Sequence, residues 1–302
     1  MTDQRHAVAI DRICFGHRID QSCRSAPIGK RTRPSSAVAH FAVIDVQACH
    51  PLFLPAGRKG AHVGLIGHSR LEASAVEYDR QRERPLALRQ AQFRKEVQAF
   101  IGQEATHRRI HSLFNAQLTQ QGFDNALERC ATRRLQANAH RDVRIHVAAT
   151  AATEHLTAIF ADWMLSHPEA LEGSEERLKT LWLWHSAEES EHRSTAFDVY
   201  HAIGGNHEWR LRLFRYITIT FFSDVARQTV RNLWHDKALF RWSTWRSAAS
   251  FLFGARGLIS SNRAQWREYL REDFHPGQQD GARSEQWLRD NSAQFTVVGQ
   301  PT

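Results

Sequence analysis

Hydrophobic residues recur at intervals of three and four positions over most of the chain from residue 86 onward, and this period is typical of amphipathic helices. A first long helix is predicted over 86–120, where Phe93, Val97, Phe100 and Ile101 follow the period and Gly122 supplies a stop. Further helices are predicted, in chain order, over 124–138, 141–166, 174–203, 208–235 and 242–272. The pattern therefore indicates an antiparallel helical bundle.

Proline and glycine support this division of the chain. Residues 86–167 and 169–275 contain no proline, as expected of long helices, while Pro168 ends one predicted helix and Gly204-Gly205 ends another. Residues 1–85 follow neither a helical nor a strand period, so they are left unassigned. We expect three segments: an unassigned 1–85, a helical metal-binding bundle over 86–275 and a flexible polar tail over 276–302.

Composition and charge exclude several functional classes. The 302 residues carry a net charge of +8, but the basic residues form no dense stripe, so we expect no nucleic-acid partner. The four cysteines have no metal-binding spacing, and the sequence shows neither a signal peptide nor a membrane span, so we expect a cytoplasmic protein. The stretch 208–235 is basic and amphipathic, which leaves peripheral membrane contact open, as well as a homo-oligomer.

Carboxylates and imidazoles recur at helical spacing inside the predicted bundle. Glu104, His107 and His111 share one face of the first long helix, because their spacings are three and four residues. His185, Glu189 and His192 repeat this pattern in the helix over 174–203, with Glu188 alongside. Glu154 interrupts a run of small apolar residues and needs a partner. These positions are the candidate metal ligands.

The chemistry of metal sites explains such a pattern. Two Glu-x-x-His pairs, with glutamates from other helices, build the dinuclear carboxylate sites of ferritin-like bundles. Mixed oxygen and nitrogen ligands suit iron, manganese or zinc. The chain contains three Glu-x-x-His pairs where chance predicts about one, given 18 histidines. We interpret the third, Glu272 to His275, as accidental or as a local cap before Pro276.

Longer motifs resemble a bacterial family of predicted metal-dependent hydrolases. The resemblance covers about 95–276, and the motifs that carry it are Phe100 to His111, Trp184 to His192, Ala196 to Tyr200, Tyr269-Leu270-Arg271 and Phe274-His275-Pro276. It implies an all-α, ferritin-like antiparallel helical bundle with additional amphipathic helices and a metal site. It implies as leading ligands Glu104, His107, Glu154, Glu189 and His192, followed by His111, His185 and Glu188.

The sequence departs from that family near its N-terminus. Members carry a Phe-Pro-x-Gly-Glu segment whose glutamate is a natural ligand, whereas Arg58 follows Pro55-Ala56-Gly57 here, and arginine cannot ligate a cation. One choice of codons for Cys49 to Lys59, read one base later, restores the family segment. We therefore keep two hypotheses for this region, translation in a wrong frame and disorder. The gene sequence decides between them.

Three functions remain open at this point. In a hydrolase, one or two metal ions would activate water for attack on a small-molecule substrate, with Glu188 as the catalytic group that moves the proton. In the alternative, a di-iron oxidase or oxygenase would activate dioxygen with the same ligands. In the third, the bundle is a non-catalytic scaffold with a degenerate site. Iron is the favoured metal, with zinc or manganese as alternatives.

Overall fold

The computed structural model describes residues 7–9, 86–172, 174, 176–294 and 296–298, and helices account for most of them. The prediction of an all-α fold is confirmed for this part of the chain. One short antiparallel pair of strands joins its ends, with Ala7 opposite Val298. The longer helices are α4 (Leu86–Gln120), α5 (Ala126–Asn138), α6 (Val143–Ser166), α7 (Glu176–His192), α8 (Thr195–Ala202), α9 (His207–His235), α10 (Trp242–Phe253), α11 (Leu258–Glu268) and α12 (Ala282–Asp290).

The shorter elements are β1 (Ala7–Ala9), β2 (Thr296–Val298) and the single-turn helices η3 (Pro168–Leu171), η4 (Pro276–Gln278) and η5 (Ser292–Gln294). Several helices begin or end at the capping residues and glycines that the sequence provides. The side chain of Asp142 caps α6 by accepting a hydrogen bond from the amide of Arg144. Gly122 after α4 and Gly204 after α8 have φ of 87° and 78°, a conformation that favours glycine.

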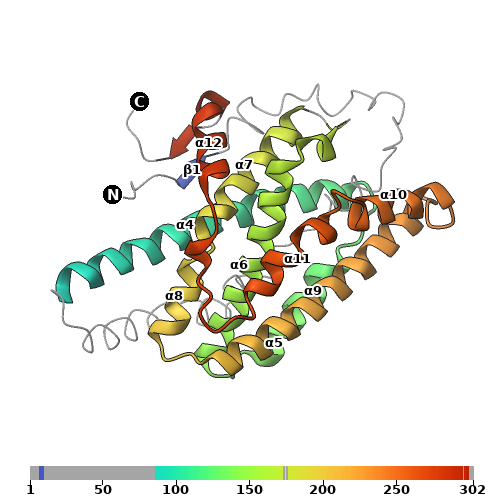
Figure 1. Cartoon of the computed structure of the whole chain (residues 1–302). Coiled ribbons are helices and arrows are strands. Elements are labelled where there is room, and N and C mark those ends of the chain that lie inside the picture. Colours follow the sequence, from blue (N-terminus) through green and yellow to red (C-terminus); the bar gives the residue numbers. More distant parts are fainter. Residues whose placement is uncertain (1–6, 10–85, 173, 175, 295, 299–302) are drawn as a thin grey trace.

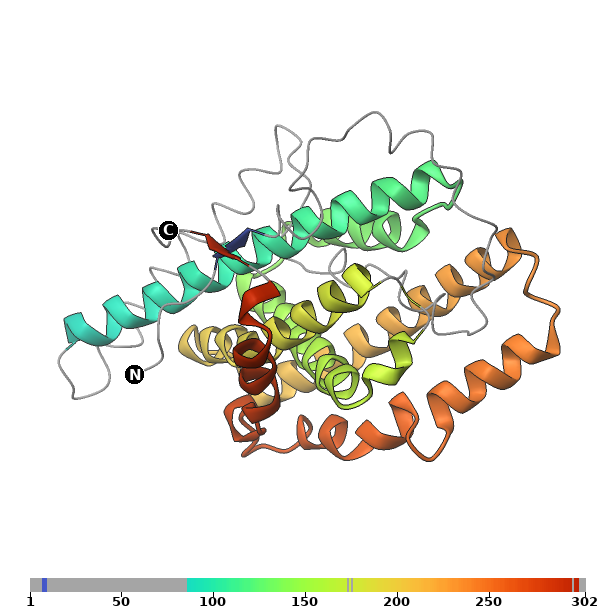
Figure 2. The same ribbon diagram turned by 90° about the horizontal axis from the view of Figure 1, so that it is seen from above.

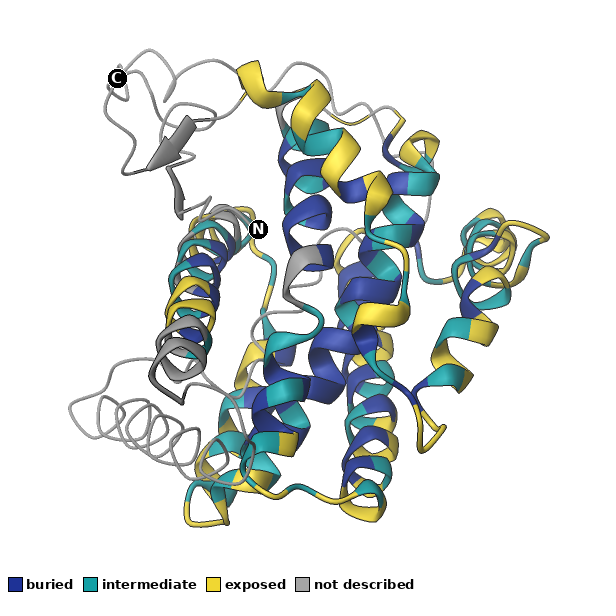
Figure 3. Ribbon diagram, turned by 60° about the vertical axis from the view of Figure 1, so that its left-hand side comes forward, coloured by how far each residue is buried: buried dark blue, intermediate teal, exposed yellow. Residues whose placement is uncertain are grey.

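Helix α6 forms the centre of the bundle and contacts α7, α8, α9 and α11 (Figure 1). It is buried over most of its length, from Val147 to Leu165 (Figure 3). Small residues such as Ala148, Ala151 and Ala152 let neighbouring helices approach closely. Seen from above, α4 runs along one side of the bundle and α10 and α11 along the other, with α6 and α7 between them (Figure 2). Helix α6 therefore presents different side chains to several partners at once.

Two of the predicted helices are each divided in the structure. The prediction over 174–203 becomes α7 and α8, because the chain turns at Arg193 and Ser194, where the Arg193 guanidinium donates a hydrogen bond to the carbonyl of Asp280. The prediction over 242–272 becomes α10 and α11, which are separated by Gly254 to Gly257. A Cβ atom at Gly257 would lie 2.7 Å from the backbone of Leu252, so this turn requires glycine.

The two ends of the chain differ in how much is described. The segment 276–302, predicted as a flexible tail, contains α12, and its Trp287 and Leu288 pack against buried Leu181 and Trp184 of α7. The unassigned segment 1–85, with Arg58 and the two hypotheses for it, lies outside the described residues apart from β1. The packing of Trp287 and Leu288 against α7 joins α12 to the helical bundle.

The amphipathic stretch predicted over 208–235 is α9, the long helix that follows a cap by Asn206. One side of α9 buries Leu213, Phe214 and Phe221, while Ile219 and Trp234 are exposed. None of the described helices combines the length and apolar character needed to cross a membrane. Peripheral membrane contact through this helix stays a prediction.

Candidate metal centre

Three helices meet at a group of buried acidic and imidazole side chains. Helix α4 contributes Glu104 and His107, α6 contributes Glu154, and α7 contributes Glu188 and Glu189. We call these five residues the carboxylate cluster. Each is at most 3% exposed, which is rare for glutamate unless it is paired or binds a cation. The helical spacing of the sequence therefore brings candidate ligands from three separate segments to one place.

The carboxylates of Glu104, Glu154 and Glu189 are close together. Each offers one oxygen atom, and these three atoms lie within 4.8 Å of one another. Two negative charges about 4 Å apart repel by about 4 kcal/mol in a medium of dielectric constant about 20. Carboxylates that share a buried site therefore need protons or a cation among them. The group has the spacing and the donor atoms of a metal site.

His107 lies against the carboxylates with both ring nitrogens. Its Nδ1 atom is 3.4 Å from Oε1 of Glu104 and 3.2 Å from Oε1 of Glu189, and its Nε2 atom is 3.4 Å from Oε2 of Glu188. Burial lowers the pKa of His107, but the three glutamates outweigh burial and raise it well above its usual range. The imidazolium partly compensates the carboxylates, and a metal ion binding here would compete with its proton.

The second face of the centre holds two more histidines. Nε2 of His185 is 3.6 Å from Oε1 of Glu189 and 3.2 Å from Nε2 of His111. His107, His185 and Glu189 form a second group whose ligand atoms lie within 4.8 Å of one another. Burial, followed by the charge of His107, lowers the pKa of His185 well below its usual range. His185 is therefore neutral, the form in which imidazole binds metals.

Glu189 belongs to both groups. Burial and the charge of Glu104 raise the pKa of its carboxyl, but the hydrogen bond from His107 and the charges of the neighbouring histidines outweigh them and lower the pKa to about 2. The residue is thus an ionised carboxylate between a protonated and a neutral imidazole. This position makes Glu189 the natural bridge between the two candidate groups.

The structure places the sequence-predicted ligands as follows. Glu104, His107, Glu154, His185 and Glu189 come together in the two candidate groups. Glu188 lies beside His107, and His111 lies beside His185. His192 ends α7, and its side chain is outside the part of the chain that the structure describes.

Two tryptophans of α7, Trp182 and Trp184, lie next to the centre. The ring of Trp184 is fully buried and meets His107 edge-on, with centroids 5.6 Å apart. The ring centroid of Trp182 is 5.6 Å from that of His111 and 5.9 Å from that of His185. Their positions one turn or less before the candidate ligands on α7 were the only sequence signal that they line the centre. The two tryptophans therefore form apolar contacts with the histidines of the centre.

A buried histidine next to Glu154 belongs to a different environment. His155 meets Phe214, Tyr269 and Phe274 at centroid distances of 5.7, 4.6 and 5.2 Å. Burial lowers its pKa to about 3, so it is neutral. We call His155, Phe197, Arg210, Phe214, Tyr269 and Phe274 the aromatic cluster. Two of its members, Tyr269 and Phe274, belong to the C-terminal motifs of the sequence, which therefore serve packing rather than the metal centre.

Comparison with known proteins places this centre in a family. No curated protein and no solved structure matches the chain. A family profile described as "Predicted metal-dependent hydrolase" matches residues 72–280. The match leaves out the first 71 residues, which agrees with the departure of the N-terminus from the family. Because the match covers more than half of the 302 residues, the chain belongs to the family of predicted metal-dependent hydrolases.

Proposed function

We propose that this protein is a hydrolase whose carboxylate cluster and His185 hold one or two transition-metal ions. The observation that carries the proposal is the approach of Glu104, Glu154 and Glu189 within 4.8 Å in the buried centre of the bundle. Such a group is costly without a cation, and evolution retains costly buried charges where they serve function. Membership of the family of predicted metal-dependent hydrolases supports the same function.

The donor set fits a transition metal. Glu104, Glu154 and Glu189 would supply oxygen ligands, and His107 and His185 would supply nitrogen ligands. Three carboxylates with imidazole favour iron, with manganese and zinc as alternatives. When bound, such an ion supplies Lewis acidity, which polarises a carbonyl or phosphoryl oxygen and lowers the pKa of water.

The residues of the chain have separate tasks in this proposal. Oε2 of Glu188 lies 3.4 Å from Nε2 of His107, and this ion-pair contact helps to hold the imidazole with Nδ1 directed at Glu104 and Glu189. The same contact lets Glu188 take up a proton from His107. Glu188 is thus a positioning residue that also stores a proton, a refinement of the catalytic role predicted from the sequence.

The test is metal analysis combined with hydrolysis. We expect purified protein to contain between one and two metal ions per chain and to hydrolyse members of a panel of uncharged esters. Glu189→Gln should lose the metal and the hydrolysis together, since Glu189 belongs to both ligand groups. Glu176→Gln is the matched control, because Glu176 is exposed at the other end of α7. Metal-free wild-type protein that retains full hydrolysis would overturn the proposal.

One observation favours a second candidate, a di-iron oxidase. Three carboxylates and a Glu-x-x-His pair inside a helical bundle form the donor set of proteins that activate dioxygen. Two irons per chain, with dioxygen consumption and no ester hydrolysis, would favour this candidate. The same metal analysis can be made on a variant in which the segment near Arg58 is replaced by the frame-corrected family segment. If neither this variant nor the wild type contains metal, only the hypothesis of a non-catalytic scaffold remains.

A further inference from the structure

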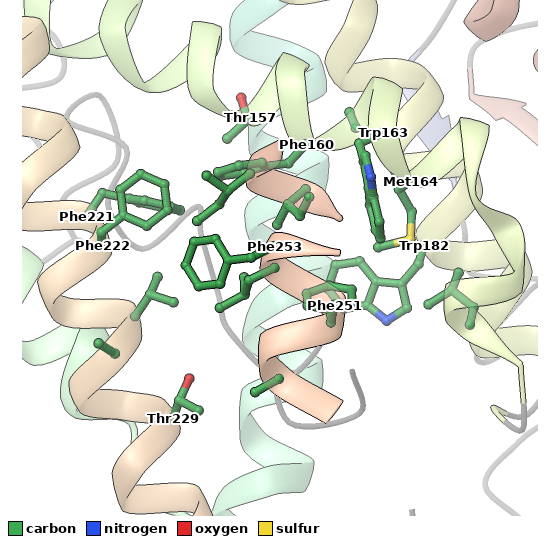
Figure 4. Close-up of a pocket in the computed structure, with 18 of the residues that line it drawn as sticks. Thr157, Phe160, Trp163, Met164, Trp182, Phe221, Phe222, Thr229, Phe251 and Phe253 are labelled. Atoms are coloured by element: carbon green, nitrogen blue, oxygen red, sulfur yellow. The ribbon is translucent and has the colours of Figure 1, made fainter. Parts of the chain in front are cut away.

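A large cavity reaches the candidate metal centre from the far side of α7. Its volume is about 540 Å³, within the range of sites that hold small organic molecules. Helices α6, α7, α9 and α10 supply most of its wall, including Phe160, Trp163, Trp182 and Phe251 (Figure 4). We call this cavity the apolar pocket. Native cores contain few voids larger than a water molecule, so it is too large to be a packing defect.

The apolar pocket runs from the surface to the metal ligands. Its lining includes Phe253 of α10, which is 62% exposed, and Val230 of α9, which is 42% exposed. The same lining includes His111 and Glu189, which are 5% and 3% exposed. Within the described part of the chain, one continuous pocket therefore joins the exposed side chains of α9 and α10 to Glu189 and His185.

The chemistry of the wall restricts what can bind. Aromatic and aliphatic side chains dominate it, and no lysine, arginine or aspartate occurs among the described lining residues. Its polar side chains away from the centre are threonines and tryptophans, such as Thr157 and Thr229 (Figure 4). A phosphate or carboxylate in the body of the pocket would lose its hydration without gaining a cationic partner. Among the described lining residues, the ionisable groups are His111, His185 and Glu189, and they lie at the inner end.

We propose that the substrate is a hydrophobic, uncharged molecule whose aliphatic or aromatic body fills the apolar pocket and whose polar reacting group lies beside Glu189 and His185. This inference rests on the proposed function for the reaction and adds the substrate class. Binding energy comes from the apolar body, and the reacting group is oriented because the ionisable side chains of the described lining are confined to one end.

The first test measures binding without using the metal. The neutral dye N-phenyl-1-naphthylamine should fluoresce on binding the purified protein, and straight-chain alcohols should displace it. The half-displacing concentration should fall about fourfold for each added methylene from butanol to octanol, the factor for burying one methylene. Absence of dye binding, or displacement that does not depend on chain length, would overturn the inference.

Variants locate the binding site. Ala248 of α10 is half-buried in the pocket wall, whereas Ser250 of the same helix is exposed and outside the wall. Ala248→Trp should weaken dye binding about tenfold or more by filling the pocket, and Ser250→Trp should leave it unchanged. Ala226→Trp, at an exposed wall position on α9, is a second blocking variant if Ala248→Trp unfolds. Wild-type affinity in a folded blocking variant would contradict the proposal.

A second test asks whether the pocket ends at the metal. Acetohydroxamic and octanohydroxamic acids carry the same chelating group, so their difference reports the chain alone. In cobalt-loaded protein, titration by visible absorption should show octanohydroxamic acid binding at least about 100-fold more tightly. Ala248→Trp should remove this preference while keeping the cobalt spectrum. A protein that binds the dye but cannot be loaded with any metal ion would count against the proposed function alone. A cobalt-loaded protein that binds both hydroxamic acids equally would count against this inference alone.

Discussion

Glu154 and His155 are neighbours on α6, yet they enter two clusters of opposite character. Glu154 joins carboxylates from α4 and α7 whose oxygens lie within 4.8 Å of one another. His155 joins the aromatic cluster, where its ring packs on Tyr269 and its Nε2 atom lies 3.3 Å from the carbonyl of Gln265. Successive side chains on a helix point about 100° apart, so one helix can serve both environments.

The two clusters treat charge differently. The aromatic cluster buries one charge, Arg210, whose guanidinium donates a hydrogen bond to the carbonyl of Arg271 and lies 5.1 and 5.2 Å from the ring centroids of Phe197 and Tyr269. The ring faces and the carbonyl stabilise that charge. The carboxylate cluster gathers negative charge that His107 alone compensates only in part. The comparison teaches that one cluster is dominated by aromatic packing, whereas the other has the donor atoms of a candidate metal site.

The largest effect on stability is expected in the aromatic cluster. Phe214 is 1% exposed and contacts both His155 and Tyr269. Phe214→Ala should lower the free energy of unfolding by about 3–5 kcal/mol, because it removes a buried ring and leaves a cavity. Denaturant unfolding measures this, and Phe240→Ala is the control, since Phe240 is 86% exposed. The folded fraction of the variant should still bind metal normally.

The carboxylate cluster should respond in the opposite way. Glu104→Ala is expected to weaken metal binding by at least about 100-fold, since even residues that only support a ligand contribute 10–100-fold. The melting temperature of the metal-free protein should not fall, because the change also removes a buried negative charge. Metal titration gives the change in affinity, and thermal unfolding of the same preparation gives the change in melting temperature. A fall in melting temperature with metal binding intact would mean that Glu104 has a structural role.

The contrast also explains what the sequence could predict. The helix over 86–120 was predicted with the bounds of α4, because its period and the stop at Gly122 are local signals. The shared face of Glu104 and His107 follows from the same period. The turn at Arg193 and Ser194 has no glycine or proline to mark it, and it was missed. It depends on contact with Asp280, which is distant in sequence.

The arrangement of the centre was predictable only in part. Glu154 needed a buried partner, but no local signal indicated that Glu104 and Glu189 would provide it, since helix packing decides which faces meet. The apolar pocket had no sequence signal at all. The ring centroids of Trp163 in α6 and Phe251 in α10 are 5.2 Å apart, although 88 positions separate the two residues in the sequence. The division of 242–272, by contrast, was available from Gly254 and Gly257.

A smaller effect on stability is expected when one charge is removed from the carboxylate cluster. Glu154→Gln keeps the shape of the side chain and removes one of three neighbouring negative charges. The metal-free variant should be more stable than metal-free wild type by about 1 kcal/mol, because repulsion between buried carboxylates is relieved. With excess metal the order should reverse, since the wild type gains more from binding. The free energies of unfolding of the variant and the wild type, measured once with a chelator and once with added metal, test both expectations. Equal stability in both conditions would show that the cluster holds no ligand.

The smallest effect is expected where the two clusters adjoin. His155→Phe replaces a neutral buried ring with an apolar ring of similar shape. The variant loses the contact with the carbonyl of Gln265 but gains apolar burial among Phe214, Tyr269 and Phe274, so stability should change by less than about 1 kcal/mol. Metal content should stay at the wild-type value, because His155 faces away from Glu154's partners. His140→Phe, at an exposed position, controls for the added ring. Loss of metal in His155→Phe alone would show that packing on one face of α6 sets the position of Glu154 on the other, so that the two clusters act as one unit.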